Sequence, residues 1–171
     1  MTEKTKKYIG SIFLTPVAVF LILNRGDFIF ILDHINLLFH EGGHGIFKIF
    51  GGFIYTLGGS LMQLIIPSLF IFYFASNKKK IGLQISILYL AQNLMNISVY
   101  VADARLKILP LLGGKNVYHD WNYIFSRMNI LEYDVVISLI IYYTAVCICI
   151  LALLLPMLGK EYKTESIDLN L

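Results

Sequence analysis

Residues 28–53 read FIFILDHINLLFHEGGHGIFKIFGGF, an apolar stretch long enough to cross a bilayer. Besides the HEGGH block, four polar residues interrupt it: Asp33, His34, Asn36 and Lys48. Ionisable groups are costly in hydrocarbon, so this segment is too polar to face lipid on all sides. One of its faces must contact protein or water, and the segment is expected to span the membrane, to re-enter it or to lie along its surface.

The composition of the chain is that of a membrane protein. Of the 171 residues, 57% are hydrophobic and only 15% are charged, with a mean hydropathy of +0.71. A soluble domain of this length could not bury so much apolar surface in one core. The net charge of +3 is modest, and the lysines gather at segment ends, where they suit lipid headgroups. The sequence contains no basic stripe of the kind that binds nucleic acid.

Four other segments are apolar enough to span a bilayer: residues 8–24, 57–76, 81–102 and 134–157. We therefore expect an all-α, polytopic membrane helix bundle of about four spanning helices plus the helix that carries HEGGH. The chain is expected to form a single integral membrane domain over residues 1–171, with residues 1–7 as a cytoplasmic N-terminus and residues 159–171 as a flexible tail. Two glycine pairs, Gly51-Gly52 and Gly58-Gly59, predict a break between the motif helix and the next span.

The positions of the lysines predict the orientation of these spans. They form three clusters: Lys4, Lys6 and Lys7; Lys78, Lys79 and Lys80; and Lys160 and Lys163. All three clusters fall in the cytoplasm if residues 28–53 enter the membrane and return, or lie along its outer surface. HEGGH and the loop of residues 105–133 then lie together toward the other side. We expect a multi-pass protein of the bacterial cytoplasmic membrane that contacts membrane lipid.

The block His40-Glu41-Gly42-Gly43-His44 follows the His-Glu-x-x-His pattern. On a helix, His40 and His44 share one face, so both imidazoles can reach one zinc ion, while Glu41 can accept a proton from water. This layout is typical of a metalloprotease site. The alternative is a polar helix turn packed against other helices, which would make the protein a non-catalytic membrane scaffold or a metal-binding sensor.

A zinc ion held by two histidines needs a third protein ligand, and Asp103 is the first choice. It ends a span in which steps of three and four residues place four polar side chains on one face: Asn93, Asn96, Tyr100 and Asp103. A polar stripe in a membrane helix usually faces the interior of the bundle. Alternatively, Asp103 pairs with Arg105 or Lys107, and Arg105 could also hold the Asp103 carboxylate in place beside the metal.

His119 and Asp120 are the competing choice for the third ligand. They could equally line a substrate entrance or cap a helix that begins near Trp121. Behind the ligands, Asn36 and Asp33 lie one and two turns before His40 on nearly the same face, where they could orient an imidazole. Asn96 is a further candidate for this supporting role.

HEGGH in an apolar segment, the Gly58-Gly59-Ser60 block before the next span and the Asp at a later helix end together resemble the site-2 protease family of intramembrane zinc metalloproteases. The resemblance implies that His40, His44 and Asp103 bind zinc and that Glu41 is the base. The family's Asp is usually followed by Gly, whereas Ala104 follows Asp103 here. The wider set of blocks also resembles small bacterial membrane proteins of unassigned activity.

The sequence thus predicts an intramembrane metalloprotease with one zinc ion, which hydrolyses a membrane-embedded or membrane-proximal peptide. Hydrolysis of a lipid amide or ester by the same zinc and base is the catalytic alternative.

Overall fold

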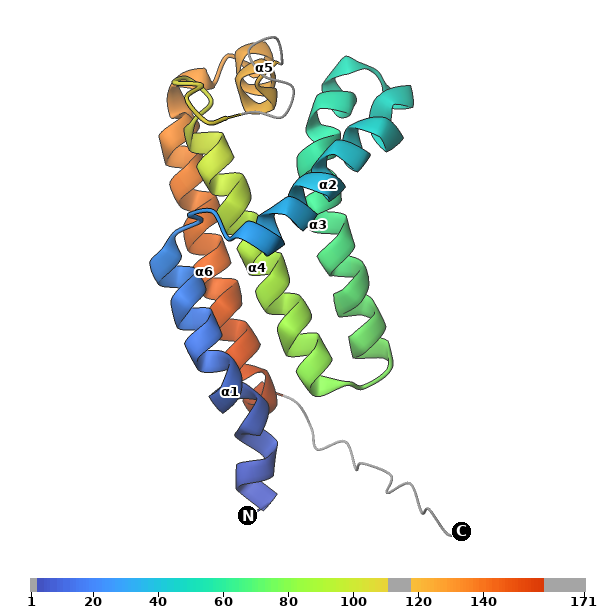
Figure 1. Ribbon diagram of the computed structural model, residues 1–171, viewed down its shortest axis with the longest axis vertical. Coiled ribbons are helices and arrows are strands. Elements are labelled where there is room, and N and C mark those ends of the chain that lie inside the picture. Colours follow the sequence, from blue (N-terminus) through green and yellow to red (C-terminus); the bar gives the residue numbers. More distant parts are fainter. Residues whose placement is uncertain (1–2, 111–117, 159–171) are drawn as a thin grey trace.

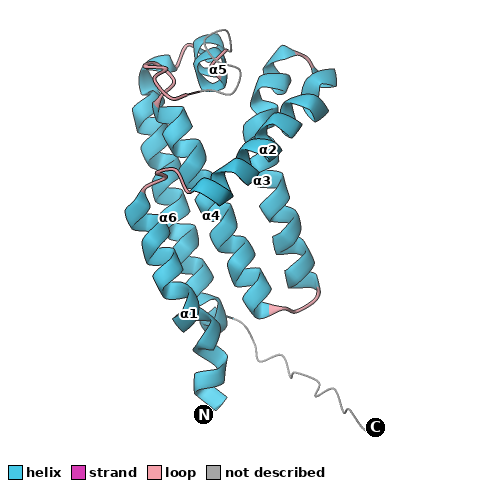
Figure 2. Ribbon diagram, viewed as in Figure 1, coloured by secondary structure: helices cyan, strands magenta, loops and turns pink. Residues whose placement is uncertain are grey.

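The computed structural model describes residues 3–110 and 118–158, and these form helices and connecting loops with no strand. The order of elements along the chain is α1 (Glu3–Asn24), α2 (Phe30–Phe47), η1 (Lys48–Phe50), α3 (Gly52–Ser76), α4 (Lys80–Ala102), α5 (Asp120–Met128), η3 (Leu131–Tyr133) and α6 (Asp134–Leu158). The expected all-α helix bundle is confirmed (Figure 2). The expected tail, residues 159–171, lies outside the described residues.

Among the described residues, three helices are long and apolar enough to cross a membrane: Gly52–Ser76, Lys80–Ala102 and Leu131–Met157. The fourth expected span, Tyr8–Asn24, is apolar but shorter. Large apolar side chains lie exposed along all of these helices, as expected where lipid is the solvent. These three long helices are therefore suited to cross a membrane.

The long helices pack around α4 (Figure 1). This helix contacts α6, α3 and α1, and α1 also packs against α6. The core of this part contains small residues, including Ala91, Ala145 and Ala152, which are almost fully buried and allow the helices to approach closely. The start of α1 and the turn between α3 and α4 lie at one end of the bundle, and α5 lies at the other (Figure 1).

Helix α2 is tilted across the bundle and packs mainly on α3 (Figure 1). Its buried residues are Asp33, Asn36, His40 and Gly43, which recur at the helical period. Several of its apolar residues point outward, with Ile31 73% and Leu38 71% exposed. This polar-inside arrangement confirms that one face of the segment contacts protein, and it suits a helix that meets lipid on the other side.

The two glycine pairs behave differently from each other. Gly51 has a positive φ of 87° and separates η1 from α3, whereas Gly58 and Gly59 lie inside the unbroken α3. The predicted break is therefore confined to Gly51. The second pair serves packing instead: a Cβ atom on Gly43 of α2 would lie 2.2 Å from the carbonyl oxygen of Gly58, so only glycine allows the two helices to approach this closely.

Candidate metal centre

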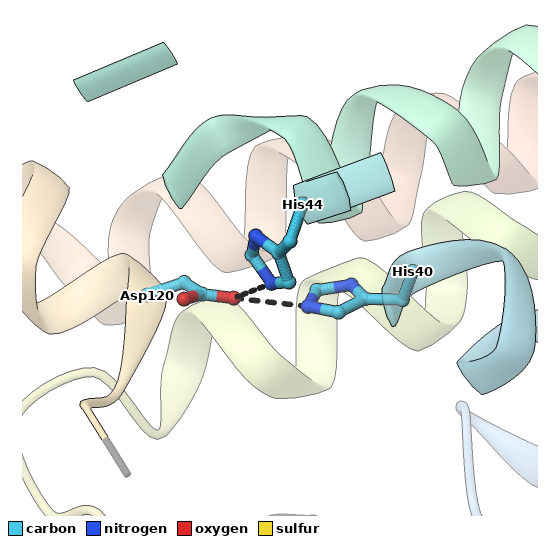
Figure 3. A group of neighbouring side chains, drawn as sticks. All are labelled: His40, His44 and Asp120. Atoms are coloured by element: carbon cyan, nitrogen blue, oxygen red, sulfur yellow. Dashed lines mark hydrogen bonds and ion pairs between the residues drawn. The ribbon is translucent and has the colours of Figure 1, made fainter. Parts of the chain in front are cut away.

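Two histidines of α2 meet a carboxylate that is distant in sequence (Figure 3). His40 and His44 lie one turn apart on this helix, and Asp120 is the first residue of α5. The Oδ2 atom of Asp120 is 2.9 Å from His40 Nε2 and 3.2 Å from His44 Nε2. One ligand atom from each residue lies within 4.8 Å of the other two. The described part of the chain holds no other such group of three or more His, Cys, Asp or Glu residues.

The remaining nitrogen of each imidazole is engaged by an oxygen atom. His40 Nδ1 lies 3.0 Å from Gln63 Oε1, and His44 Nδ1 lies 2.8 Å from the carbonyl oxygen of Tyr55. Because these oxygens only accept hydrogen bonds, each Nδ1 must carry a proton and donate it. Both histidines are therefore held in the tautomer that leaves the lone pair on Nε2, the atom that faces Asp120.

This arrangement places three acceptor atoms against one another. In neutral imidazoles with Nδ1 protonated, each Nε2 offers only a lone pair, and the oxygen of the Asp120 carboxylate offers only lone pairs as well. Such a cluster is repulsive unless positive charge lies among its members. Either a second proton on the imidazoles or one cation supplies that charge.

The pKa shifts of His44 and Asp120 agree with this need for positive charge. The hydrogen bond with Asp120 is the largest influence on His44 and raises its pKa, although burial opposes it. Burial acts to raise the pKa of Asp120, yet hydrogen bonds from His40 and His44 lower it overall. The contact thus favours the ionised form of the Asp120 carboxyl group and, without a metal ion, the protonated form of His44. A metal ion would have to displace that proton.

A glycine on α3 makes room for the first histidine. A Cβ atom on Gly59 would lie 2.4 Å from His40 Nε2 and 2.5 Å and 2.6 Å from two ring carbons. The imidazole of His40 therefore lies directly over the backbone of α3, between Gly59 and the Gln63 side chain one turn later. This explains why the Gly58-Gly59 pair accompanies HEGGH in the sequence.

The start of α5 brings Asp120 to the histidines. His119 is the N-cap residue of α5, and its Nδ1 accepts a hydrogen bond from the backbone N–H of Asn122. The backbone N–H of Asp120 donates to the hydroxyl of Tyr100 on α4 at 3.1 Å. The expectation that this block caps a helix is confirmed for His119. The negative charge of Asp120 is stabilised by its position at the positive end of the α5 helix dipole.

Asp103, the expected third ligand, is not part of the group around His40 and His44. Its two carboxylate oxygens accept hydrogen bonds from the backbone N–H groups of Ile108 and Leu109, at 2.9 Å and 3.0 Å. One of them also faces His119 Nε2 at 3.3 Å. Asp103 thus holds the chain just after α4, at residues 108–109. Of the candidates from the sequence, the structure groups Asp120 with His40 and His44, and it leaves both Asp103 and His119 outside that group.

A pairing of Arg105 with Asp103 was one alternative that the sequence left open, and the structure gives Arg105 a different partner. Arg105 forms an ion pair with Asp134 at the start of α6, with Nε and Nη2 each 2.8 Å from a carboxylate oxygen. This pair joins the end of α4 to α6. The Asp103 carboxylate binds the backbone N–H groups of the following loop instead.

The other polar residues expected behind the site form one connected network. Asn96 accepts a hydrogen bond from Gln63, the residue that holds His40, and Asp33 accepts hydrogen bonds from Asn96 and Asn36. Gln63 was not among the site residues expected from the sequence. The signal that pointed to it was its spacing of one turn after Gly59, which places both residues on the same face of α3.

A cavity of about 880 Å³ opens beside the three side chains, within the range of ligand-binding cavities. Glu41, which is exposed, lines it together with His40, His44 and Asp120. Aromatic and aliphatic side chains form much of the remaining wall, including Phe28, Leu37, Val99, Tyr100, Tyr118 and Tyr123. A mainly apolar cavity with a few convergent polar groups is the usual form of a binding site.

Comparison of the chain with known protein families, curated proteins and solved structures finds no match.

Proposed function

We propose that this protein is a zinc-dependent hydrolase of the membrane that cleaves peptide bonds at or within the bilayer. One observation carries the proposal: His40 and His44 direct their Nε2 atoms at the Asp120 carboxylate while their Nδ1 atoms are held by Gln63 and Tyr55. The HEGGH pattern supplies Glu41 beside this group.

The donor set fits a catalytic zinc site. Two imidazole nitrogens and one carboxylate oxygen are three protein ligands of the types that zinc prefers, and a tetrahedral ion bound by them keeps one position open. The oxygen atoms at both Nδ1 positions fix the ring orientations, as is usual for histidines that bind metals. The mutual repulsion of the three acceptor atoms, which a cation relieves, supports the same interpretation.

The proposed reaction divides among a few residues. When bound, zinc polarises the scissile carbonyl and makes a water molecule more acidic. Glu41 accepts a proton from the attacking water and delivers it to the leaving amine. The apolar wall of the cavity limits access of bulk water, which strengthens the electrostatic interactions at the reacting groups.

The setting of the site supports a substrate that resides in the membrane. The cavity is lined from α2, α3, α4 and α5, and the outward face of α2 is apolar. An apolar peptide segment can therefore approach from lipid without crossing an aqueous surface. A lipid amide or ester would meet the same metal and base, so the substrate arm of the test must include both classes.

The test compares three variants of the purified protein. Wild type should carry about one equivalent of zinc and should cleave a membrane peptide in detergent or vesicles. Glu41→Gln should keep the zinc and lose hydrolysis, because Glu41 transfers protons but does not bind the metal. His40→Ala should lose both, whereas His34→Ala, which removes an exposed histidine from the same helix, should lose neither.

Three results would redirect the proposal. Activity of Glu41→Gln equal to that of wild type would exclude the proposed base. Cleavage of lipid amides or esters but of no peptide would assign the site to lipid hydrolysis. Zinc binding without hydrolysis of either class would favour a metal-binding sensor or scaffold.

A further inference from the structure

A chain of hydrogen bonds connects His40 to a buried carboxylate on its own helix. His40 Nδ1 donates to Gln63 Oε1 at 3.0 Å, Gln63 Nε2 donates to Asn96 Oδ1 at 3.0 Å, and Asn96 Nδ2 donates to Asp33 Oδ1 at 3.3 Å. The path leaves α2, crosses α3 and α4, and returns to α2 at Asp33. We call these four residues the Asp33 relay.

The relay is needed because the two ends cannot touch. Asp33 and His40 are seven residues apart, or about 10 Å along a helix that rises 1.5 Å per residue. They lie on the same face, so hydrogen bonds can join a carboxylate at position 33 to the imidazole only through intervening groups. Gln63 and Asn96 are the two amides that fill this gap.

Every donor in the relay points toward Asp33. Each amide accepts at its oxygen from the His40 side and donates from its nitrogen toward the carboxylate. Hydrogen bonds arranged head to tail polarise one another, and this effect is stronger in a medium of low dielectric constant. Negative charge at Asp33 therefore makes Gln63 Oε1 a stronger acceptor and His40 a stronger electron donor at Nε2.

The carboxylate of Asp33 is buried and accepts several hydrogen bonds. It is only 4% exposed, and among the described residues no Lys or Arg forms an ion pair with it. Besides Asn96, its carboxylate accepts hydrogen bonds from Gln92 at 2.7 Å, from Asn36 at 3.2 Å and from the backbone N–H of Ile29. A buried carboxylate inside a membrane protein is costly and is usually functional.

We propose that Asp33 is a positioning residue that sets the metal affinity of His40 through Gln63 and Asn96. This inference rests on the proposed metal site and adds a remote control of its strength. A histidine that donates directly to a carboxylate loses about tenfold to a hundredfold in metal affinity when that partner is removed. Because two amides intervene here, the expected loss lies near the lower limit, at about tenfold.

The primary test measures zinc affinity of the full-length protein by competition with a coloured chelator. Asp33→Asn keeps an oxygen that can accept hydrogen bonds but removes the charge, so zinc should bind about tenfold more weakly at unchanged stoichiometry. Asp27→Asn is the matched control. Asp27 lines the same cavity but is outside the relay, and its loss should leave zinc affinity within about twofold of wild type if charge acts along the relay rather than through space.

A second variant separates the relay from folding. Asn96→Ala breaks the relay but leaves Asp33 bonded to Gln92 and Asn36, and it should weaken zinc binding to the same extent. Gln63→Glu, added to Asp33→Asn, places a carboxylate directly on His40 Nδ1 and should restore the affinity. Thermal unfolding of each metal-free variant records any loss of stability.

The measurements distinguish failure of the relay from failure of the proposed metal site. If wild type binds no zinc, the metal site itself is refuted. If wild type binds zinc but Asp33→Asn binds it equally well, or only loses stability, the relay is refuted. An equal loss in Asp33→Asn and Asp27→Asn would also overturn it, because the effect would then be that of general charge.

Discussion

Replacing Gly59 by alanine tests whether the position of His40 controls metal binding. The new Cβ atom would lie 2.4 Å, 2.5 Å and 2.6 Å from three atoms of the imidazole, whereas uncrowded contacts begin at 3.4 Å. The ring must therefore retreat by about 1 Å, and metal–ligand distances tolerate only about 0.2 Å. Overpacking of this kind typically costs about 1–3 kcal/mol of stability.

The ring cannot retreat without breaking another contact. Its Nδ1 is held by Gln63 and its Nε2 faces Asp120. A shift of the ring away from the new methyl group therefore lengthens the distance to at least one of these two partners. We expect zinc affinity to fall by more than the roughly tenfold to hundredfold typical of a lost supporting group. The assay is chelator competition, accompanied by thermal unfolding.

Gly42 provides the matched control inside the motif itself. A Cβ atom there would meet nothing within 4 Å, so Gly42→Ala should keep wild-type zinc affinity. It should also gain stability of up to about 1 kcal/mol, the usual difference between glycine and alanine inside a helix. Wild-type zinc affinity in Gly59→Ala, or weakened affinity in Gly42→Ala, would refute the proposed position of His40.

Two further predictions concern the ligand set. Asp120→Ala should lose zinc almost entirely, because it removes a ligand. Asp103→Asn should still bind one equivalent of zinc at saturation and should lose mainly stability, because its hydrogen bonds to the next loop are weakened. Metal analysis of both variants would contradict the choice of Asp120 if the two results were reversed. In the metal-free protein, the hydrogen bond with Asp120 raises the pKa of His44 above 6.5, so this pair stabilises the fold fully below pH 6.5 and loses that effect as the pH rises through the raised pKa. The stability lost on Asp120→Asn, measured by thermal unfolding, should therefore shrink from about pH 6 to about pH 8; a difference that grew with pH would show that His44 is not the group responsible.

The sequence predicted the parts of the site that depend on local helix geometry. The four-residue step from His40 to His44 placed both imidazoles on one face. The polar stripe on α4 was expected to face the bundle interior, and two of its members, Asn96 and Tyr100, line the cavity. The burial of Asp33 and Asn36 follows from the same period. Each of these features requires only the rise and turn of a single helix.

The third ligand depends on tertiary structure, which periodicity does not describe. Asp120 reaches His40 across 80 positions, and Asp103 instead binds the backbone N–H groups of Ile108 and Leu109. A carboxylate at a helix end can bind either a metal ion or the next loop, and the sequence does not distinguish these roles. The role of Gln63 was also hidden, because the same side chain bonds both to His40 and to a neighbouring helix.

The central claim is that His40, His44 and Asp120 together bind one zinc ion, and X-ray absorption at the zinc edge tests it most directly. The purified, zinc-loaded protein should show two imidazole nitrogens at about 2.0–2.1 Å and oxygen ligands at about 2.0–2.2 Å. Asp120→Ala should remove the bound ion and His34→Ala should leave the spectrum unchanged. A spectrum without imidazole scattering, or one with sulfur ligands at about 2.3 Å, would contradict the account.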